Sequence, residues 1–360
     1  MGKISNSFYN PQFHIGLGGN LIIIRIFYGL LLLPLCFLYS QGGTYSKPSI
    51  CLIINEHFRG EREFAERMRI ACERLSWKVA IYDPDSFKKA DSHFDWIFTL
   101  VPDKEFSLKY DDYLILFDPV HHYFNQDGHL NEKYRGYTGY LTTYGNSELL
   151  LEDIKYKKKQ FYPKRWYPTA HYRPYRKVTP TRLFYFIGHW GDRYYNHRYQ
   201  TLQNELAQTN YANLFGNPST GVSYGKAFKG DIKYDGESVI NLISEMGVCL
   251  VFHSKTHIQH EIPSGRIFEA AAASAVIISD LNPFIIKHFG DAVFYVDQEL
   301  SGEEMFKQID TYMAWIQNHS EEALKMAQRA HQIFEEKFLL ENQLLDFNNF
   351  RESLQFVDNN

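Results

Sequence analysis

Two series of short apolar runs, each alternating with helix-like segments, constrain the fold of this chain more than any other sequence feature. The first series opens with the buried-strand pattern SICLIIN, continues through a segment with apolar residues at helical spacing, and reaches a second strand pattern, KVAIYD. Such a strand–helix–strand unit is typical of a parallel α/β sheet. These three segments are residues 49–55, 56–77 and 78–83, and further strands are predicted at 94–100, 113–122 and 137–144.

A second series of the same kind occupies the C-terminal half. It begins with RLFYFIG and repeats the alternation of apolar strands with helical segments. The fold class is therefore predicted to be α/β, with two Rossmann-like domains. The tail at 321–350 has apolar residues three and four positions apart and is predicted to be helical. Strands are predicted at 182–188, 211–217, 248–253, 275–280 and 292–297, and helices at 196–208, 237–247 and after residue 264.

Between these two series, residues 154–181 are rich in Lys, Arg, Tyr and Pro and show no helical period. We interpret this segment as a solvated linker between domains. A basic patch for nucleic acid or anionic lipid is the alternative. The formal net charge of −4 gives no general attraction for nucleic acid, so no such partner is expected. Charged residues at 22% and apolar residues at 44% are typical of a folded globular protein.

The N-terminus carries an apolar run from Ile26 to Leu38, preceded by Arg25. We interpret residues 1–45 as a membrane anchor or a signal segment, and a misassigned translation start is the alternative. The four cysteines contain no Cys-x-x-Cys pair, which argues against a disulfide framework or a zinc knuckle and favours a reducing compartment. These cysteines are Cys36, Cys51, Cys72 and Cys249.

The stretch EIPSGRIFEAAAASAVIISD, residues 261–280, carries the strongest indication of a site. It follows a strand, and Gly265 opens a helix, so backbone N–H groups there can face a phosphate at the carboxyl end of the sheet. Arg266 would add a positive charge. Glu261 is expected where a sugar would lie, and Glu269 is expected to reach ribose hydroxyls. The alternative is structural: an early glutamate favours the helix dipole and the alanines pack on the sheet.

This stretch resembles the Glu-x7-Glu signature of retaining GT-B glycosyltransferases. It also resembles the EAxAxGxPVI run of group 1 enzymes and the RxFE core of their CgeB-like branch. The upstream text LFYFIGHWGDRYYNHRYQTLQNEL…ANLFGN is similar to the opening of the C-terminal domain in that family. The resemblance is strongest over residues 183–297. It implies two Rossmann-like domains facing a cleft, with a C-terminal helix crossing back to the first domain.

The resemblance further implies a retaining transfer of sugar from a nucleotide-sugar donor to a glycan or lipid-linked acceptor. No cofactor or metal is expected. Glu261 would contact donor-sugar hydroxyls and Glu269 the ribose, while the Gly188 loop and Arg193 would hold the diphosphate. Arg198 and Lys226 are alternative cations for that role. The remaining predicted site residues are His253, Ser264, Gly265 and Arg266 for the donor, and His121 and His122 for the donor sugar or the acceptor.

Four further details of the sequence bear on the resemblance. Ala273-Ser274-Ala275 stands where family members commonly carry a Gly-Thr/Cys-Pro turn. Asp83-Pro-Asp85 is a literal Asp-x-Asp, the metal–diphosphate motif of the other glycosyltransferase fold, but a strand-ending turn is the simpler interpretation. His121 and His122 are equally well explained as surface or capping residues. The loop containing Arg59 and Gly60 corresponds in position to one that approaches donor and acceptor.

The predicted domains are an apolar segment at 1–45, an acceptor-side domain at 46–175, a donor-side domain at 176–335, and a C-terminal helix and tail at 336–360. Two other functions remain open: an inactive member that binds nucleotide or glycan, and a nucleotide-sugar epimerase of the same fold. A dinucleotide-dependent oxidoreductase is excluded because INEHFRGER lacks the Gly-x-Gly-x-x-Gly loop. The expected location is the cytoplasm or the cytoplasmic face of a membrane, or a secretory lumen in a eukaryotic source.

Overall fold

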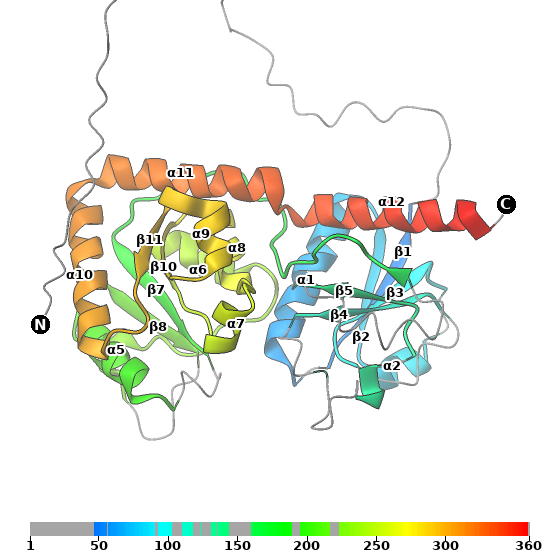
Figure 1. Ribbon diagram of the computed structural model, residues 1–360, viewed down its shortest axis with the longest axis horizontal. Helices are drawn as coiled ribbons and strands as arrows, with labels where there is room; N and C mark the ends of the chain where they lie inside the picture. Colours follow the sequence, from blue (N-terminus) through cyan, green and yellow to red (C-terminus); the bar gives the residue numbers. More distant parts are fainter. Residues whose placement is uncertain are drawn as a thin grey trace, which may run out of the picture. The chain divides into compact units, whose positions relative to one another are not determined.

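Two parallel sheets organise the chain from Lys47 onward, which forms one compact unit (Figure 1). The computed structural model describes residues 47–55, 57–90, 93–102, 110–117, 123, 131–134, 136–143, 160–188, 195–216 and 223–358. The apolar N-terminal segment predicted at 1–45 lies outside these residues. Within them, no helix has both the length and the apolar character needed to cross a membrane.

The first sheet has six parallel strands in the order β2-β1-β3-β4-β5-β6. The five strands predicted in this half are confirmed, although β4 is shorter than predicted. The sixth, β6, falls in the segment that was predicted to be a linker. The strands are β1 (Ser49–Ile53), β2 (Lys78–Tyr82), β3 (Trp96–Thr99), β4 (Asp112–Leu116), β5 (Gly139–Thr142) and β6 (Gln160–Phe161), with helices α1 (Arg59–Arg74) and α2 (Pro84–Lys88).

The Asp-x-Asp sequence forms the start of α2. The Asp83 carboxylate accepts hydrogen bonds from the backbone N–H groups of Asp85 and Ser86, each at 3.0 Å, and from the Ser86 hydroxyl. These bonds satisfy donors that the first turn of a helix leaves unpaired. The predicted strand-ending turn is thereby confirmed, with Asp83 as its N-cap.

The second sheet has five parallel strands in the order β11-β10-β9-β7-β8. All five predicted strands are confirmed. The strands are β7 (Arg182–Ile187), β8 (Ala212–Gly216), β9 (Gly247–Val251), β10 (Val276–Asp280) and β11 (Val293–Val296), and the helices are α5 (His197–Ala207), α6 (Ser238–Met246), α7 (Lys255–Gln259), α8 (Gly265–Ala272) and α9 (Pro283–Phe289).

The alanine run lets α8 pack closely on this second sheet. Ala270 and Ala271 are fully buried and share one core cluster with Phe184 of β7 and Ile277 of β10. Small side chains allow a helix backbone to approach a sheet closely, so this part of the motif has a packing role. α8 is thus held against the face of the second sheet, with its first turn following the carboxyl end of β9.

The C-terminal tail crosses back to the first half, as expected. Phe334 of α11 (Ser320–Lys337) packs in the core of the second sheet, whereas Leu344 and Phe347 of α12 (Leu340–Asp358) pack with Phe64 of α1. Figure 1 shows α12, in red, running along the first half. The preceding helix, α10 (Gly302–Asn318), begins with a capping box between Ser301 and Glu304.

The connector between the halves is buried, which corrects the prediction of a solvated linker. Trp166, Thr169 and Ala170 are completely buried and His171 is 1% exposed. The Thr169 hydroxyl donates to the Phe338 carbonyl at 2.5 Å, and the Leu340 N–H donates to the Ala170 carbonyl at 3.0 Å. The connector therefore lies against the break between α11 and α12, because its aromatic and small residues pack there.

Candidate active site

At the carboxyl end of the second sheet, a buried pair fixes the loop that leads into α8. His253 follows β9, and its ring Nδ1 lies 2.8 Å from Oδ1 of Asp280, the last residue of β10. The Ser264 N–H donates to the other ring nitrogen, Nε2, at 2.9 Å. Because Nε2 accepts, the ring proton is assigned to Nδ1 and donates to Asp280. Both ring nitrogens of His253, predicted as a donor ligand, are thus engaged, and the residue positions Ser264.

The start of α8 is close to the connector. Ser264 is the N-cap, and its hydroxyl accepts from the Arg266 N–H at 3.2 Å. A Cβ on Gly265 would lie 3.0 Å from the Pro168 carbonyl oxygen, tighter than ordinary contact. Glycine at this position therefore permits the close approach of connector and helix. The helix start predicted to face a phosphate is in place, with Pro168 as its neighbour.

Glu269 is held by two arginines, one from each half of the structure. Arg67 of α1 donates from Nη1 to one carboxylate oxygen, and Arg266 of α8 donates from Nη1 to the other at 2.5 Å. Glu269 and Arg67 are each 3% exposed. The guanidinium of Arg266 also lies 5.4 Å and 5.0 Å above the rings of Phe184 and Phe186, contacts that favour a fixed orientation.

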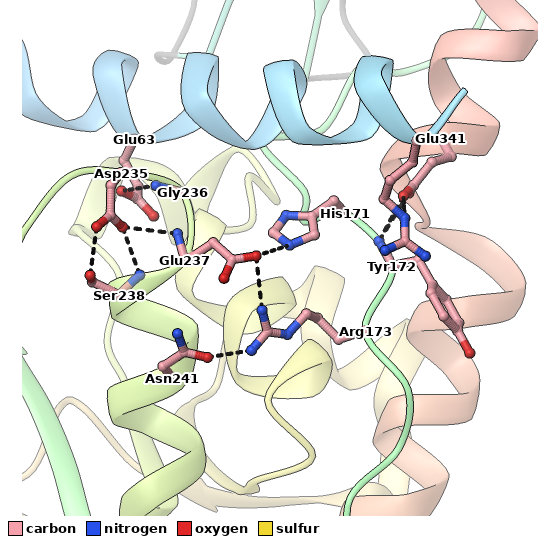
Figure 2. A network of polar contacts seen from close by, with 11 residues as sticks. Glu63, His171, Tyr172, Arg173, Asp235, Gly236, Glu237, Ser238, Asn241 and Glu341 are labelled. Carbon is pink, nitrogen blue, oxygen red and sulfur yellow. Dashed lines mark hydrogen bonds and ion pairs between the residues drawn. The ribbon is translucent and has the colours of Figure 1, made fainter. Parts of the chain in front are cut away.

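Arg67 belongs to a polar stripe on α1, made of Arg59, Glu63 and Arg67 at four-residue spacing, which faces the second half. Arg59 forms an ion pair with Asp231 at 2.5 Å. The Gly236 N–H donates to Glu63 Oε2 at 3.0 Å, as Figure 2 shows. We call these three residues the α1 stripe. Sequence reasoning missed its role, although the helical spacing of the three charges was visible.

Gly236 marks the closest approach of the second half to α1. Its φ is +79°, and an added Cβ would lie 2.9 Å from backbone atoms of Arg67 and Glu66. Only glycine adopts this conformation readily and also leaves that space free. The backbone of Gly236 and the backbone of α1 are therefore in direct contact.

Next to this contact lies a polar network that ties the connector to both halves (Figure 2). Glu237 accepts from Arg173 Nη1 at 3.0 Å and lies 3.4 Å from Nε2 of His171. On the other side, the Tyr172 N–H donates to both oxygens of Glu341, at 3.0 Å each. His171 and Arg173 of the connector thus contact Glu237, the N-cap of α6, whereas Tyr172 between them contacts Glu341 of α12. These contacts explain why the segment is not a free linker.

Burial shifts the protonation of two groups at this junction. It raises the pKa of Glu63 to about 7, against the opposing effect of Arg67 and with a further rise from Glu269. It lowers the pKa of His171 to about 3, assisted by Arg173, Arg67 and Arg74. Among the described residues, Glu63 Oε1, Arg67 Nε and both ring nitrogens of His171 have no hydrogen-bond partner. Buried groups with shifted pKa values and unpaired polar atoms are more frequent at functional sites than elsewhere in a protein.

Glu261, the first glutamate of the motif, lies in a different environment. It is exposed, and its φ of +54° is uncommon for a residue with a side chain. The turn that holds it is fixed on both sides: the Ile262 N–H donates to the His257 carbonyl at 2.8 Å, and Asn282 Nδ2 donates to the Ile262 carbonyl at 2.9 Å. Strained backbone of this kind occurs preferentially at functional sites. The two carboxylates thus differ sharply, since one is accessible and the other is buried.

The other predicted site residues are only partly described. Gly188 follows β7, whose last residue, Ile187, pairs with Gly216 at the end of β8. His121, His122 and Arg193 lie outside the described residues, and their roles stay predictions. Of the alternative cations, Arg198 donates to the Gln298 carbonyl at 2.5 Å, and Lys226 is exposed.

Comparison with known proteins agrees with this architecture. Residues 190–348 match the model of a family described as glycosyl transferase-like. A sucrose-phosphate synthase from Thermosynechococcus elongatus aligns over 86% of this chain and 100% of its own, at 13% identity and a TM-score of 0.53. The Anabaena protein HepE, in a structure with UDP, aligns over 85% and 99%, at 11% identity and a TM-score of 0.50. No curated protein matches the chain in sequence.

The order of strands in the two sheets, the helix that crosses back and these structural neighbours establish the GT-B fold. Residues 190–348, which match the glycosyl transferase-like family, lie on this fold, and the match supports a transferase enzyme.

Proposed function

We propose that the enzyme is a retaining, metal-independent transferase that moves a sugar from a nucleotide sugar to a glycan or lipid-linked acceptor. In this proposal Glu261 contacts donor-sugar hydroxyls and Glu269 contacts the ribose. The observation that carries it is the Glu261–Glu269 pair at the carboxyl end of the second sheet, where open α/β sheets bind ligands. Accessible Glu261 suits a contact with the reacting sugar, and enclosed Glu269 suits the nucleotide end.

For Glu269 to reach a ribose, Arg67 has to move away. We propose that α1 separates from α8 when the donor enters and that the halves then close around it. The unpaired buried atoms of Glu63, Arg67 and His171 support this motion, since each costs about 1–3 kcal/mol when it is kept from water. Separation of α1 from the second half would return these groups to solvent. The free energy gained in this way would offset part of the free energy lost with the contacts.

The diphosphate is assigned to the helix start at Ser264 and Gly265, to the Gly188 loop, and to Arg193. Backbone N–H groups and an arginine placed there would stabilise the negative charge that develops on the departing diphosphate. His253 and Asp280 act indirectly, because they hold the Ser264 N–H in position. Such a site would have its donor pool on the cytosolic side, and we propose that location.

The experiment that tests this function is a thermal-shift panel with UDP, GDP, CDP and their sugars, followed by turnover of the sugar that stabilises most. We expect one nucleotide to raise the melting temperature of the wild type, and Glu261→Gln to lose turnover while keeping that shift. NMR of the product should give the same anomeric configuration as the donor. Turnover should also survive EDTA. A wild type that no nucleotide stabilises would overturn the proposal.

A binding-only function is the second candidate, and the burial of Glu269 behind Arg67 favours it. A protein of that kind would bind the nucleotide as tightly as the enzyme would, but would give no transfer or donor hydrolysis against a broad acceptor panel. Donor hydrolysis by the wild type, lost in Glu261→Gln, excludes it.

A further inference from the structure

A cavity of about 410 Å³ lies at the break between α11 and α12, apart from all the residues assigned above to the donor. This volume is within the range of about 300–1,000 Å³ that is usual for small-ligand sites. The connector forms one wall and the helix break forms another. The lining residues used below are Lys164, Arg165, Tyr167, His288, Lys337 and Phe338.

The cavity wall is positively charged. Lys164 is neutralised by Asp346 at 2.6 Å. Arg165 and Lys337, by contrast, have no carboxylate within ion-pair distance in the part of the chain that the structure describes. The pKa of His288 is lowered by burial and then by the charges of Lys287, Lys337 and Arg165. Two cations without a carboxylate partner therefore act on the same small space, next to an imidazole whose pKa burial and these charges lower.

The floor of the cavity is apolar and rigidly held. The rings of Tyr167 and Phe338 lie 5.5 Å apart, edge to face. Gln343 clamps the Tyr167 backbone: its side-chain oxygen accepts from the Tyr167 N–H at 2.9 Å, and its amide donates to the Tyr167 carbonyl at 3.0 Å. A preorganised floor lowers the cost of ordering the site when a ligand binds.

We propose that this cavity is a second ligand site, which binds a phosphate monoester group through Arg165 and Lys337. A phosphate monoester carries close to two negative charges at neutral pH, which matches these two cations that have no carboxylate partner. A guanidinium binds phosphate through paired N–H groups, and lysine adds a point charge. Neutral His288 can donate one further hydrogen bond, and the aromatic floor accommodates the body of the ester.

This assignment also explains the basic, aromatic segment of the sequence. Two of its cations, Lys164 and Arg165, and two of its aromatic residues, Tyr162 and Tyr167, line the cavity. The Tyr167 and Phe338 rings further lie 5.9 Å and 5.2 Å from the ring of Phe268, the residue before Glu269. The site is independent of the proposed donor chemistry, and either one can hold without the other.

The test measures binding of glycerol 3-phosphate by calorimetry and binding to phosphatidylcholine vesicles with and without phosphatidic acid, at constant ionic strength. Three proteins are compared: the wild type, the double variant Arg165→Gln/Lys337→Gln, and a control, Lys307→Gln/Lys325→Gln. The control removes the same two charges from exposed positions on α10 and α11. Lys337→Gln alone, also at an exposed position, serves if the double variant unfolds.

We expect saturable binding by the wild type and the control, and binding at least tenfold weaker in the cavity variant. If glycerol 3-phosphate binds saturably and the cavity variant alone weakens this binding, the ligand is a soluble phosphate ester. If only vesicles with phosphatidic acid give this result, the ligand is a lipid headgroup. Saturation with neither probe, or equal weakening of the two double variants, would overturn the proposal.

Discussion

Arg67 on α1 covers the carboxylate of Glu269 on α8, so a helix of the first half encloses a glutamate of the second half. The two residues are 202 positions apart in the sequence. Both are nearly fully buried, and Arg266 holds the remaining carboxylate oxygen. This three-residue cluster joins the structural contact between the halves to the carboxylate that we assign to the donor ribose.

Replacing Arg67 by methionine should destabilise the protein strongly. Loss of one partner from a buried ion pair typically costs about 3–5 kcal/mol, because the other charge is left buried. Arg69 on the same helix is the matched control: its pairs with Glu66 and Glu73 are partly exposed, and such pairs contribute about 0–1 kcal/mol. Urea unfolding measures both. Equal effects of Arg67→Met and Arg69→Met would contradict a central role for the Arg67–Glu269 pair.

Gly236→Ala should weaken the contact between the halves. The substitution strains a positive-φ backbone and also places a methyl group against α1, whereas Gly230→Ala causes only the backbone strain. Both glycines have positive φ, at +79° and +92°. An added methyl group at 236 meets the α1 backbone at 2.9 Å, while the one at 230 meets nothing within 4 Å. The backbone penalty of about 1 kcal/mol is thus common to both. We expect a lower melting temperature for Gly236→Ala than for Gly230→Ala, and a larger radius of gyration in X-ray scattering. Identical behaviour of the two variants would show that the close approach has no effect.

Asp280→Asn should disturb the loop before α8 through the tautomer of His253. The carboxylate only accepts, from the His253 N–H at 2.5 Å and from Nδ1. An asparagine carries an NH₂ group in place of one carboxylate oxygen. If this donor faces Nδ1 of His253, the ring proton moves to Nε2, which can then no longer accept from the Ser264 N–H. We expect a loss of about 1.5–3 kcal/mol, as for a hydrogen bond to a charged group. Asp85→Asn, at an exposed position, is the control. Imidazole ¹⁵N shifts report the tautomer, and an unchanged Nδ1–H signal in Asp280→Asn would refute this explanation.

The raised pKa of Glu63 predicts how the stability of the protein changes with pH. The pKa of Glu63 in the folded protein is raised to about 7 from the ordinary value of 4.5, so the folded protein holds a proton that the unfolded chain has released. Its contribution to stability is therefore fully present below about pH 4.5 and is lost as the pH rises through about 7. Glu63→Gln resembles the protonated form. The melting temperature of this variant relative to the wild type should rise between pH 5 and pH 8. A constant difference would show that Glu63 is ionised throughout this range.

The sequence predicted the two α/β halves well because strand and helix periodicities are local. It also located the helix that carries Glu269, since the glycine and alanines that shape α8 lie within twelve residues of one another. Two features could not be predicted from the sequence. The first is the partner of Glu269: Arg67 lies on α1, 202 positions away, and no local pattern links the two residues. The connector looked solvated because its charges and prolines dominate its composition, whereas its burial depends on packing against the break between α11 and α12.

The most direct test is the affinity of the best-binding nucleotide, measured by calorimetry, for the wild type, Glu269→Gln and the exposed control Glu303→Gln. A folded Glu269→Gln protein, verified by circular dichroism, should bind at least about tenfold more weakly, as expected when a charge-assisted hydrogen bond is lost. Glu303→Gln should bind as the wild type does. Equal affinity of all three proteins would contradict the assignment of Glu269 to the donor ribose, and with it the proposed donor site.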